Sequence, residues 1–138
     1  MSVRLDHVVI AVSDRRRSDA FYREVVGADV VEHNGRVFYR IGEQQLNVHA
    51  ADVAPAAVAL IPVAPGNSDL CFEWPGPIGD AIAHLERKSI AVEIGPLMRH
   101  GARGPGASVY FRDPDGSLLE FISYADLARN EWKSTGRA

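Results

Sequence analysis

Short apolar runs alternate with a segment of helical periodicity in the first half of the chain. Strands are predicted over residues 4–12, 28–33, 36–41 and 44–50. Between the first two strands, Ser13 or Asp14 can cap a helix that runs to about Val26 and ends at Gly27. The turns Asn34-Gly35 and Gly42-Glu43 separate the later strands, as expected for hairpins.

The same order returns after residues 51–67, which are rich in Ala and Pro and read as a linker. A strand at 69–74 precedes a helix from about 77 to 88, and further strands are expected near 90–94, 107–112 and 117–123. The turn Asp113-Pro114-Asp115-Gly116 joins the last two strands. A final helix is expected over 125–133.

This order predicts an α+β fold in one domain, built from two β-α-β-β-β modules. Module one covers about 3–50 and module two about 68–124, with a tail over 125–138. The repeat matches His7 with Asp69, Tyr39 with Tyr110 and His49 with Glu120. The extra length of module two then falls mostly in an enlarged loop, Gly95–Gly106.

Four polar residues interrupt the apolar strands: His7, His49, Asp69 and Glu120. An unpaired carboxylate inside a protein either costs several kcal/mol or stays protonated. Four such residues at matching places in two halves suggest a shared partner, and a divalent cation is the simplest one. For each residue a purely structural role stays open, most of all for Asp69, which could end a loop.

Composition narrows the function classes. The chain has 138 residues, 46% of them hydrophobic and 24% charged, with a net charge of −3. These values suit an ordinary globular domain and give no reason to expect nucleic-acid binding. No apolar run is long enough to span a bilayer, and the single cysteine, Cys71, fits a reducing cytoplasm. Cys71 is predicted to be a small core residue.

Three segments carry a resemblance to a known family. They are Leu5-Asp6-His7-Val8-Val9-Ile10-Ala11-Val12, then Phe21-Tyr22 with Val26-Gly27, and Val109-Tyr110-Phe111-Arg112-Asp113-Pro114-Asp115-Gly116 with Leu119-Glu120-Phe121. Over about residues 3–124 the chain resembles the vicinal oxygen chelate superfamily, which includes glyoxalase I, extradiol dioxygenases, thiol transferases and bleomycin-resistance proteins. The resemblance implies two paired half-barrels and a likeness to the small glyoxalase-domain proteins.

The resemblance also implies a metal site formed by His7, His49, Asp69 and Glu120. Asp69 departs from the His that many members carry there, so it could bind through water or leave a three-ligand site. The implied ion is Ni²⁺, Mn²⁺, Fe²⁺, Co²⁺ or Zn²⁺. Glu120 would also be the catalytic residue, leaving the metal to shuttle a proton.

Substrate contacts are expected from Tyr110, Arg99, Arg103 and Arg129. Related enzymes place a tyrosine like Tyr110 against substrate, although a core tyrosine fits equally well. Arg99 and Arg103 fall in the predicted loop, where they could close over an anion or be solvated. Arg129 lies where the thiol transferases use an arginine.

Three functions follow as hypotheses. The first is a metal-dependent lyase or isomerase of glyoxalase type, acting on a small substrate that chelates the metal through vicinal oxygens. The second is an Fe(II) extradiol dioxygenase using His7, His49 and Glu120. The third is a metal-free protein that sequesters a drug or metabolite. A cytoplasmic homodimer is expected, with a site formed in one chain or across two.

Overall fold

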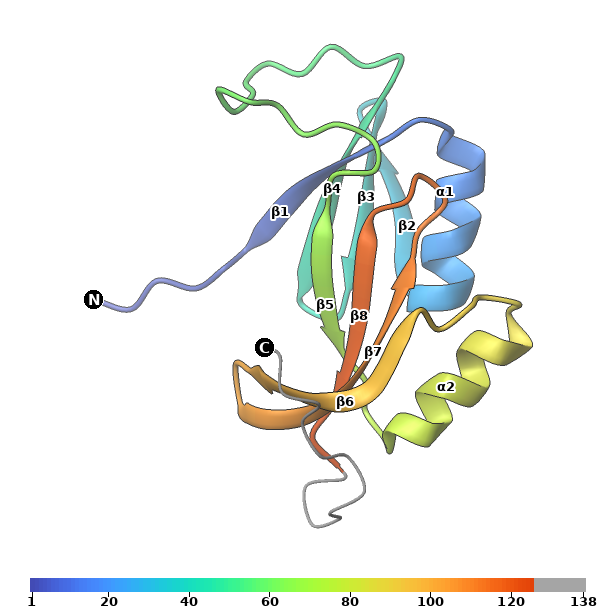
Figure 1. Ribbon diagram of the computed structural model, residues 1–138. Coiled ribbons are helices and arrows are strands. Elements are labelled where there is room, and N and C mark those ends of the chain that lie inside the picture. The colour runs from blue at the N-terminus through green and yellow to red at the C-terminus, as the bar shows by residue number, and fades with distance from the viewer. Residues whose placement is uncertain (126–138) are drawn as a thin grey trace. The chain divides into compact units, whose positions relative to one another are not determined.

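The structure, a computed structural model, describes residues 1–125 (Figure 1). It divides into two compact units, each with one four-stranded sheet. Unit 1 comprises Met1–Ser68 and Asp113–Ser117, and unit 2 comprises Asp69–Arg112 and the chain from Leu118 onward. The predicted helix over 125–133 and Arg129 lie outside the described residues.

Unit 1 contains one helix and four strands in the order β1-β4-β3-β2. The elements are β1 His7–Val12, α1 Arg15–Phe21 continued by a π-helical turn Tyr22–Val26, β2 Asp29–His33, β3 Arg36–Ile41 and β4 Gln44–Ala50. β1 and β4 run parallel and the other pairs are antiparallel. The predicted elements of this half are confirmed, with β1 beginning at His7.

Local chemistry sets the ends of α1. The Asp14 side chain accepts a hydrogen bond from the Arg17 backbone N–H at 3.1 Å, which satisfies one of the unpaired donors of the first turn. Gly27 ends the helical segment in the left-handed region, with φ 85°. The helix buries Tyr22 completely, and its ring stacks on that of Tyr39 at 4.8 Å between centroids.

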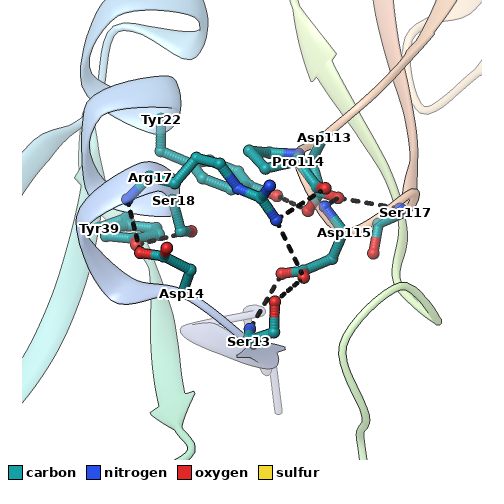
Figure 2. A network of polar contacts seen from close by, with 10 residues as sticks. All are labelled: Ser13, Asp14, Arg17, Ser18, Tyr22, Tyr39, Asp113, Pro114, Asp115 and Ser117. Atoms are coloured by element: carbon teal, nitrogen blue, oxygen red, sulfur yellow. Dashed lines mark hydrogen bonds and ion pairs between the residues drawn. The ribbon is translucent and has the colours of Figure 1, made fainter.

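The turn Asp113–Ser117 belongs to unit 1 and is hydrogen-bonded to α1 and to the π-helical turn that continues it (Figure 2). The Asp113 carboxylate accepts hydrogen bonds from the Tyr22 hydroxyl at 2.8 Å and from the backbone N–H groups of Asp115 and Ser117 at 2.9 Å each. Burial, and then the charge of Asp113, raise the pKa of Tyr22, so this phenol stays a donor. The turn therefore has a structural role.

As far as Ala125, unit 2 contains one helix and four strands in the order β5-β8-β7-β6. The elements are β5 Asp69–Glu73, α2 Ile78–Arg87, β6 Ile94–Gly101, β7 Gly104–Arg112 and β8 Leu118–Ser123. α2 buries Ile78, Ala81 and Leu85, which lie on one helical face. The α+β fold of two repeated modules is confirmed, and residues 51–68 between β4 and β5 hold no helix or strand.

The predicted loop Gly95–Gly106 was wrong, because β6 and β7 extend through it as a long hairpin. Its glycines suggested a loop, yet they permit close packing within the sheet. A Cβ added at Gly106 would lie 2.8 Å from Cγ1 of Ile122 and 2.9 Å from the carbonyl oxygen of Ser123. Glycine is therefore required for contact with β8 rather than for a flexible chain.

Strand pairing also corrects the predicted alignment of the two modules. We call two residues register counterparts when they hold the same place in the pairing of the two sheets. His7 pairs with Gln45 and Asp69 with Leu118, so His7 and Asp69 are counterparts, as predicted. The register counterpart of Glu120 is Asn47 rather than His49. Glu120 pairs with Cys71 and Asn47 pairs with Val9, and these two partners are themselves counterparts.

The counterpart of Tyr110 shifts by one residue, from Tyr39 to Phe38. Arg40 pairs with Gln45 and Arg112 with Leu118, so the chain between these equivalent pairs is one residue longer in unit 2, which adds the second residue of the shift at Glu120. A one-residue slip moves side chains to the other face of a sheet. Tyr39 is accordingly buried beneath α1, and Tyr110 lies on the face that α2 leaves uncovered.

No helix within residues 1–125 is both long and apolar enough to cross a bilayer.

Candidate functional site

The face of each sheet that carries no helix is called its open face. In unit 2 a row of paired residues crosses this face from β5 to β7: Cys71, Glu120 and Tyr110. Their apolar neighbours Leu119, Phe121 and Phe111 turn to the other face and are buried. Strand alternation therefore places the Glu120 carboxylate between a thiol and a phenol on a half-buried surface.

The phenol of Tyr110 connects Glu120 to a guanidinium. Nε of Arg99 donates a hydrogen bond to the Tyr110 hydroxyl at 2.9 Å, and the Arg99 guanidinium carbon lies 5.5 Å from the ring centroid. Burial raises the pKa of Tyr110; the Arg99 hydrogen bond opposes this shift, and the Glu120 charge adds to it. A neutral Tyr110 thus holds its proton toward the Glu120 carboxylate. Arg99 and Tyr110 are brought together from the neighbouring strands β6 and β7 rather than by a loop.

Cys71 takes a different position from the predicted one, because it lies exposed on the open face rather than in the core. Desolvation by neighbouring groups, followed by the charge and hydrogen bond of Glu120, raises the pKa of its thiol to about 12. A thiol that stays protonated is a poor nucleophile. Cys71 therefore acts as a neutral neighbour of Glu120.

Arg103 lies in the tight turn between β6 and β7 rather than in a long loop. Its guanidinium forms an ion pair with Glu73 at 2.8 Å and lies 5.3 Å from the Tyr124 ring centroid. Both charged side chains are exposed, so this pair is screened by solvent. The structure thus places Arg103 beside β5, with a carboxylate partner.

In unit 1, His7 begins β1 and keeps a partly exposed side chain, 42% accessible. Its Nδ1 lies 2.7 Å from the carboxylate of Asp6. Because a carboxylate only accepts, Nδ1 carries a proton, and in the neutral imidazole Nε2 is then the nitrogen with the lone pair. Histidines that bind metals commonly have such a partner behind them. Sequence reasoning missed Asp6, although its place next to His7 was visible.

His49 shares the open face of unit 1 with His7 but does not lie near it. His49 pairs with Ala11, which is four residues along β1 from His7. Four residues of strand span about 13 Å, and side chains stand roughly perpendicular to a sheet. Asn47 lies nearer to His7 and was also missed; the alternation of Gln45, Asn47 and His49 was its only signal.

His49 instead lines a pocket of about 240 Å³ within unit 1. The remaining lining residues are all apolar: Val9, Ala57, Val58, Ala59 and Val63. In the described part of the chain, nothing forms a hydrogen bond or ion pair with the His49 side chain. This pocket is an apolar site with one polar group.

Within residues 1–125, no group of three or more His, Cys, Asp or Glu side chains is gathered around one point that could hold a metal. The donor types nevertheless fit a divalent ion. His7 offers an oriented imidazole nitrogen, and Asp69 and Glu120 offer carboxylates on the open face of unit 2. Among residues 1–125, neither carboxylate forms an ion pair with a basic side chain.

Comparisons with known proteins cover nearly the whole chain. A family model described as Glyoxalase/Bleomycin resistance protein/Dioxygenase superfamily matches residues 4–121. Glyoxalase domain-containing protein RDO1 of Mycosarcoma maydis is 42% identical over 128 residues, which are 91% of this chain and 72% of that protein. Virulence protein STM3117 of Salmonella typhimurium is 38% identical over 122 residues, 88% of this chain and 84% of that one.

Solved structures agree with these matches. The crystal structure of STM3117 superposes with a TM-score of 0.85 at 36% identity, covering 91% of this chain and 99% of that one. A lactoylglutathione lyase from Agrobacterium tumefaciens superposes with a TM-score of 0.68 at 27% identity, covering 90% and 96%. These proteins share the fold described above, and one of them is named as an enzyme.

Proposed function

Because this chain belongs to the Glyoxalase/Bleomycin resistance protein/Dioxygenase superfamily, we propose that it is a metal-dependent enzyme of glyoxalase type. It acts as a lyase or isomerase on a small substrate with two adjacent oxygens. The observation that carries this proposal is the setting of Glu120, a carboxylate between the Tyr110 phenol and the Cys71 thiol. The neighbouring groups stay protonated, so Glu120 is the proton acceptor of this row.

His7, Asp69 and Glu120 are the proposed metal ligands, and His49 belonged to the set that the sequence suggested. The Asp6 carboxylate fixes the His7 ring so that Nε2 is the binding atom. When bound, the metal supplies Lewis-acid stabilisation of negative charge on substrate oxygen. The proposed metal is one of Ni²⁺, Mn²⁺, Fe²⁺, Co²⁺ and Zn²⁺.

Glu120 moves the proton. A carboxylate oxygen takes a proton from the substrate carbon next to a carbonyl, and the electron pair of the broken C–H bond passes to the carbonyl oxygen. Where that carbon bears a hydroxyl, the proton returns to the former carbonyl carbon while the hydroxyl proton passes to the oxygen on that carbon, which completes an isomerisation with no net oxidation. Tyr110, held by Arg99 at 2.9 Å, donates toward Glu120 and fixes its orientation.

Metal analysis and activity together test the proposal. The full chain, purified without chelator, should bind one equivalent of Mn²⁺ or Ni²⁺ and convert methylglyoxal with glutathione, or a related adduct. Glu120→Gln should abolish turnover. Glu93→Gln, which changes an exposed carboxylate paired with Arg112 at 2.8 Å, is the matched control and should leave turnover unchanged.

Two outcomes would replace this function. Less than about 0.2 equivalents of metal, without thermal stabilisation on adding Mn²⁺, Ni²⁺ or Fe²⁺, would assign a metal-free binding protein. The apolar pocket beside His49 is the observation that favours that second candidate. Oxygen uptake by the iron-loaded protein with catechol would assign the extradiol dioxygenase reaction.

A further inference from the structure

The pocket beside His49 has the size and lining of a site for one small ring. Its volume is about 240 Å³. An apolar cavity of about 150 Å³ in another protein binds benzene, so this pocket accommodates a ring with one or two substituents. Val9 comes from β1, and four more apolar residues come from the segment 57–63 that follows β4 (Figure 1).

The lining also excludes a charged group. None of the pocket residues is Lys, Arg, Asp or Glu, and burying an unpaired charge is costly. Burial of a ring against these side chains is favourable, at about 25 cal/mol for each Å² of apolar surface. The part of the occupant that lies against this lining is therefore neutral and largely apolar.

His49 gives the pocket its one polar feature. In the described residues its imidazole has no hydrogen-bond or ion-pair partner. Binding sites typically combine an apolar lining with a few polar groups that orient the ligand. An oxygen on the ring would satisfy His49. The strand register places this imidazole four residues from the level of His7.

We propose that this pocket binds a neutral hydroxy- or oxo-substituted ring of about eight non-hydrogen atoms, whose oxygen hydrogen-bonds to His49. His49 is then a specificity-determining residue rather than a metal ligand. The inference rests on the proposed function in one respect: it names the ring as the apolar part of the enzyme's substrate.

The probe is 4-methylphenol, with toluene as the ring that lacks an oxygen, and binding is followed by methyl NMR of the full chain in EDTA. We expect shifts confined to the methyl groups of the pocket: Val9, Ala57, Val58, Ala59 and Val63. His49→Phe keeps a ring but removes the hydrogen bond, so the affinity for 4-methylphenol should fall about fivefold while that for toluene is unchanged. His33→Phe on β2 is the matched control and should alter neither.

Two variants fill the pocket from different elements. Val9→Trp places the large side chain on a strand. Ala57→Trp places it at an exposed loop position, where it should not unfold the protein. Both should lose 4-methylphenol and toluene together. If both bind the two probes as the wild type does, the pocket is not the binding site.

Metal uptake separates this inference from the proposed function. His49→Phe should bind Mn²⁺ within about twofold of the wild type, whereas His7→Ala should lose it. Loss of metal in both variants would make His49 a ligand and overturn the assignment. The assignment would also be overturned if His49→Phe bound 4-methylphenol as tightly as the wild type, or if the NMR shifts fell outside the pocket. It would likewise be overturned if binding disappeared at high chain concentration, because a second copy would then fill the pocket. A wild type that binds no metal but retains the probe results would refute only the proposed enzyme.

Discussion

The two sheets share one topology but carry opposite chemistry on their open faces. In unit 1 the central row of paired residues is Val9, Asn47, Phe38 and Val31. In unit 2 the same row is Cys71, Glu120, Tyr110 and Ile94. Unit 2 therefore has a carboxylate flanked by two donors, whereas unit 1 has an apolar pocket beside its row.

This difference shows that the residues of the open-face row are not set by the fold alone. Both rows end on a partly exposed apolar residue, Val31 in β2 and Ile94 in β6, so the sheet tolerates either pattern. The first row holds neutral groups and suits an apolar ligand. The second row holds a carboxylate between two proton donors. The repeated module thus presents two equivalent surfaces with different side chains, to which the proposed function and the proposed ring site assign separate tasks.

Exchanging the central residues should have the largest effect. Glu120→Asn gives unit 2 the residue of unit 1, and turnover should fall at least about 1000-fold because the proton acceptor is lost. Asn47→Glu gives unit 1 the residue of unit 2 and should leave turnover within about tenfold, because Phe38 cannot donate as Tyr110 does. Steady-state kinetics on metal-loaded protein would measure both. Equal losses in the two variants would contradict the division of tasks.

The two hairpin turns differ as well, and breaking the longer one should cost stability. Asp113→Ala removes the acceptor of three hydrogen bonds and leaves the buried Tyr22 hydroxyl unpaired, so the free energy of unfolding should fall by about 3 kcal/mol. Glu43→Ala changes the exposed short turn of unit 1 and should cost less than about 0.5 kcal/mol. Urea unfolding followed by circular dichroism measures both. A cost below 1 kcal/mol for Asp113→Ala, roughly that of one ordinary hydrogen bond, would contradict the role of the turn.

The counterparts His7 and Asp69 differ in what holds their side chains in place. The ring of His7 is hydrogen-bonded to the carboxylate of Asp6. Asp6→Asn should weaken Mn²⁺ or Ni²⁺ binding about 10- to 100-fold without unfolding the chain. Titration calorimetry measures the affinity. Asp14→Asn, at the cap of α1, serves as the control for loss of a nearby acidic residue. Unchanged affinity in Asp6→Asn would show that the ring of His7 needs no such partner.

The smallest effect concerns the thiol of the second row. Because the pKa of Cys71 is raised to about 12, its thiol stays protonated at pH values where an ordinary cysteine has ionised. In chelator, the rate of alkylation by iodoacetamide should keep rising until at least about pH 10.5. Circular dichroism at each pH confirms that the chain is folded. An alkylation rate that levels off near pH 9 would show that Cys71 is an ordinary, fully solvated thiol.

The sequence predicted the order of strands and helices well, because apolar periodicity and turn residues agree locally. It failed between Gly95 and Gly106, where glycine indicates a loop by propensity. In the structure, Gly106 lies against Ile122 and Ser123, a contact between strands that local propensity does not encode. Long-range packing thus decided this segment.

The candidate site shows the same limit. His7 and Asp69 were matched correctly, because both begin the first strand of a module. The counterpart of Glu120 was placed two residues too far, at His49, because the counterpart of Tyr110 was already misplaced by one residue and the longer turn of unit 2 adds another. In strands, a small error of register changes the face or the neighbours of a side chain. Cys71 was predicted to be a core residue and Asp6 had no predicted role, because their settings depend on strand pairing and on a contact with His7.

The central claim is that one divalent ion is held by His7 and by the carboxylate of the second row, while His49 serves the apolar pocket. A crystal structure of the full chain soaked in Mn²⁺, with anomalous diffraction to locate the ion, tests it most directly. The account predicts a single Mn²⁺ bound by Nε2 of His7 and a carboxylate oxygen of Glu120, with the His49 ring free of the ion. A Mn²⁺ ion held by residues that include neither His7 nor Glu120, or no ion at saturating concentration, would contradict it.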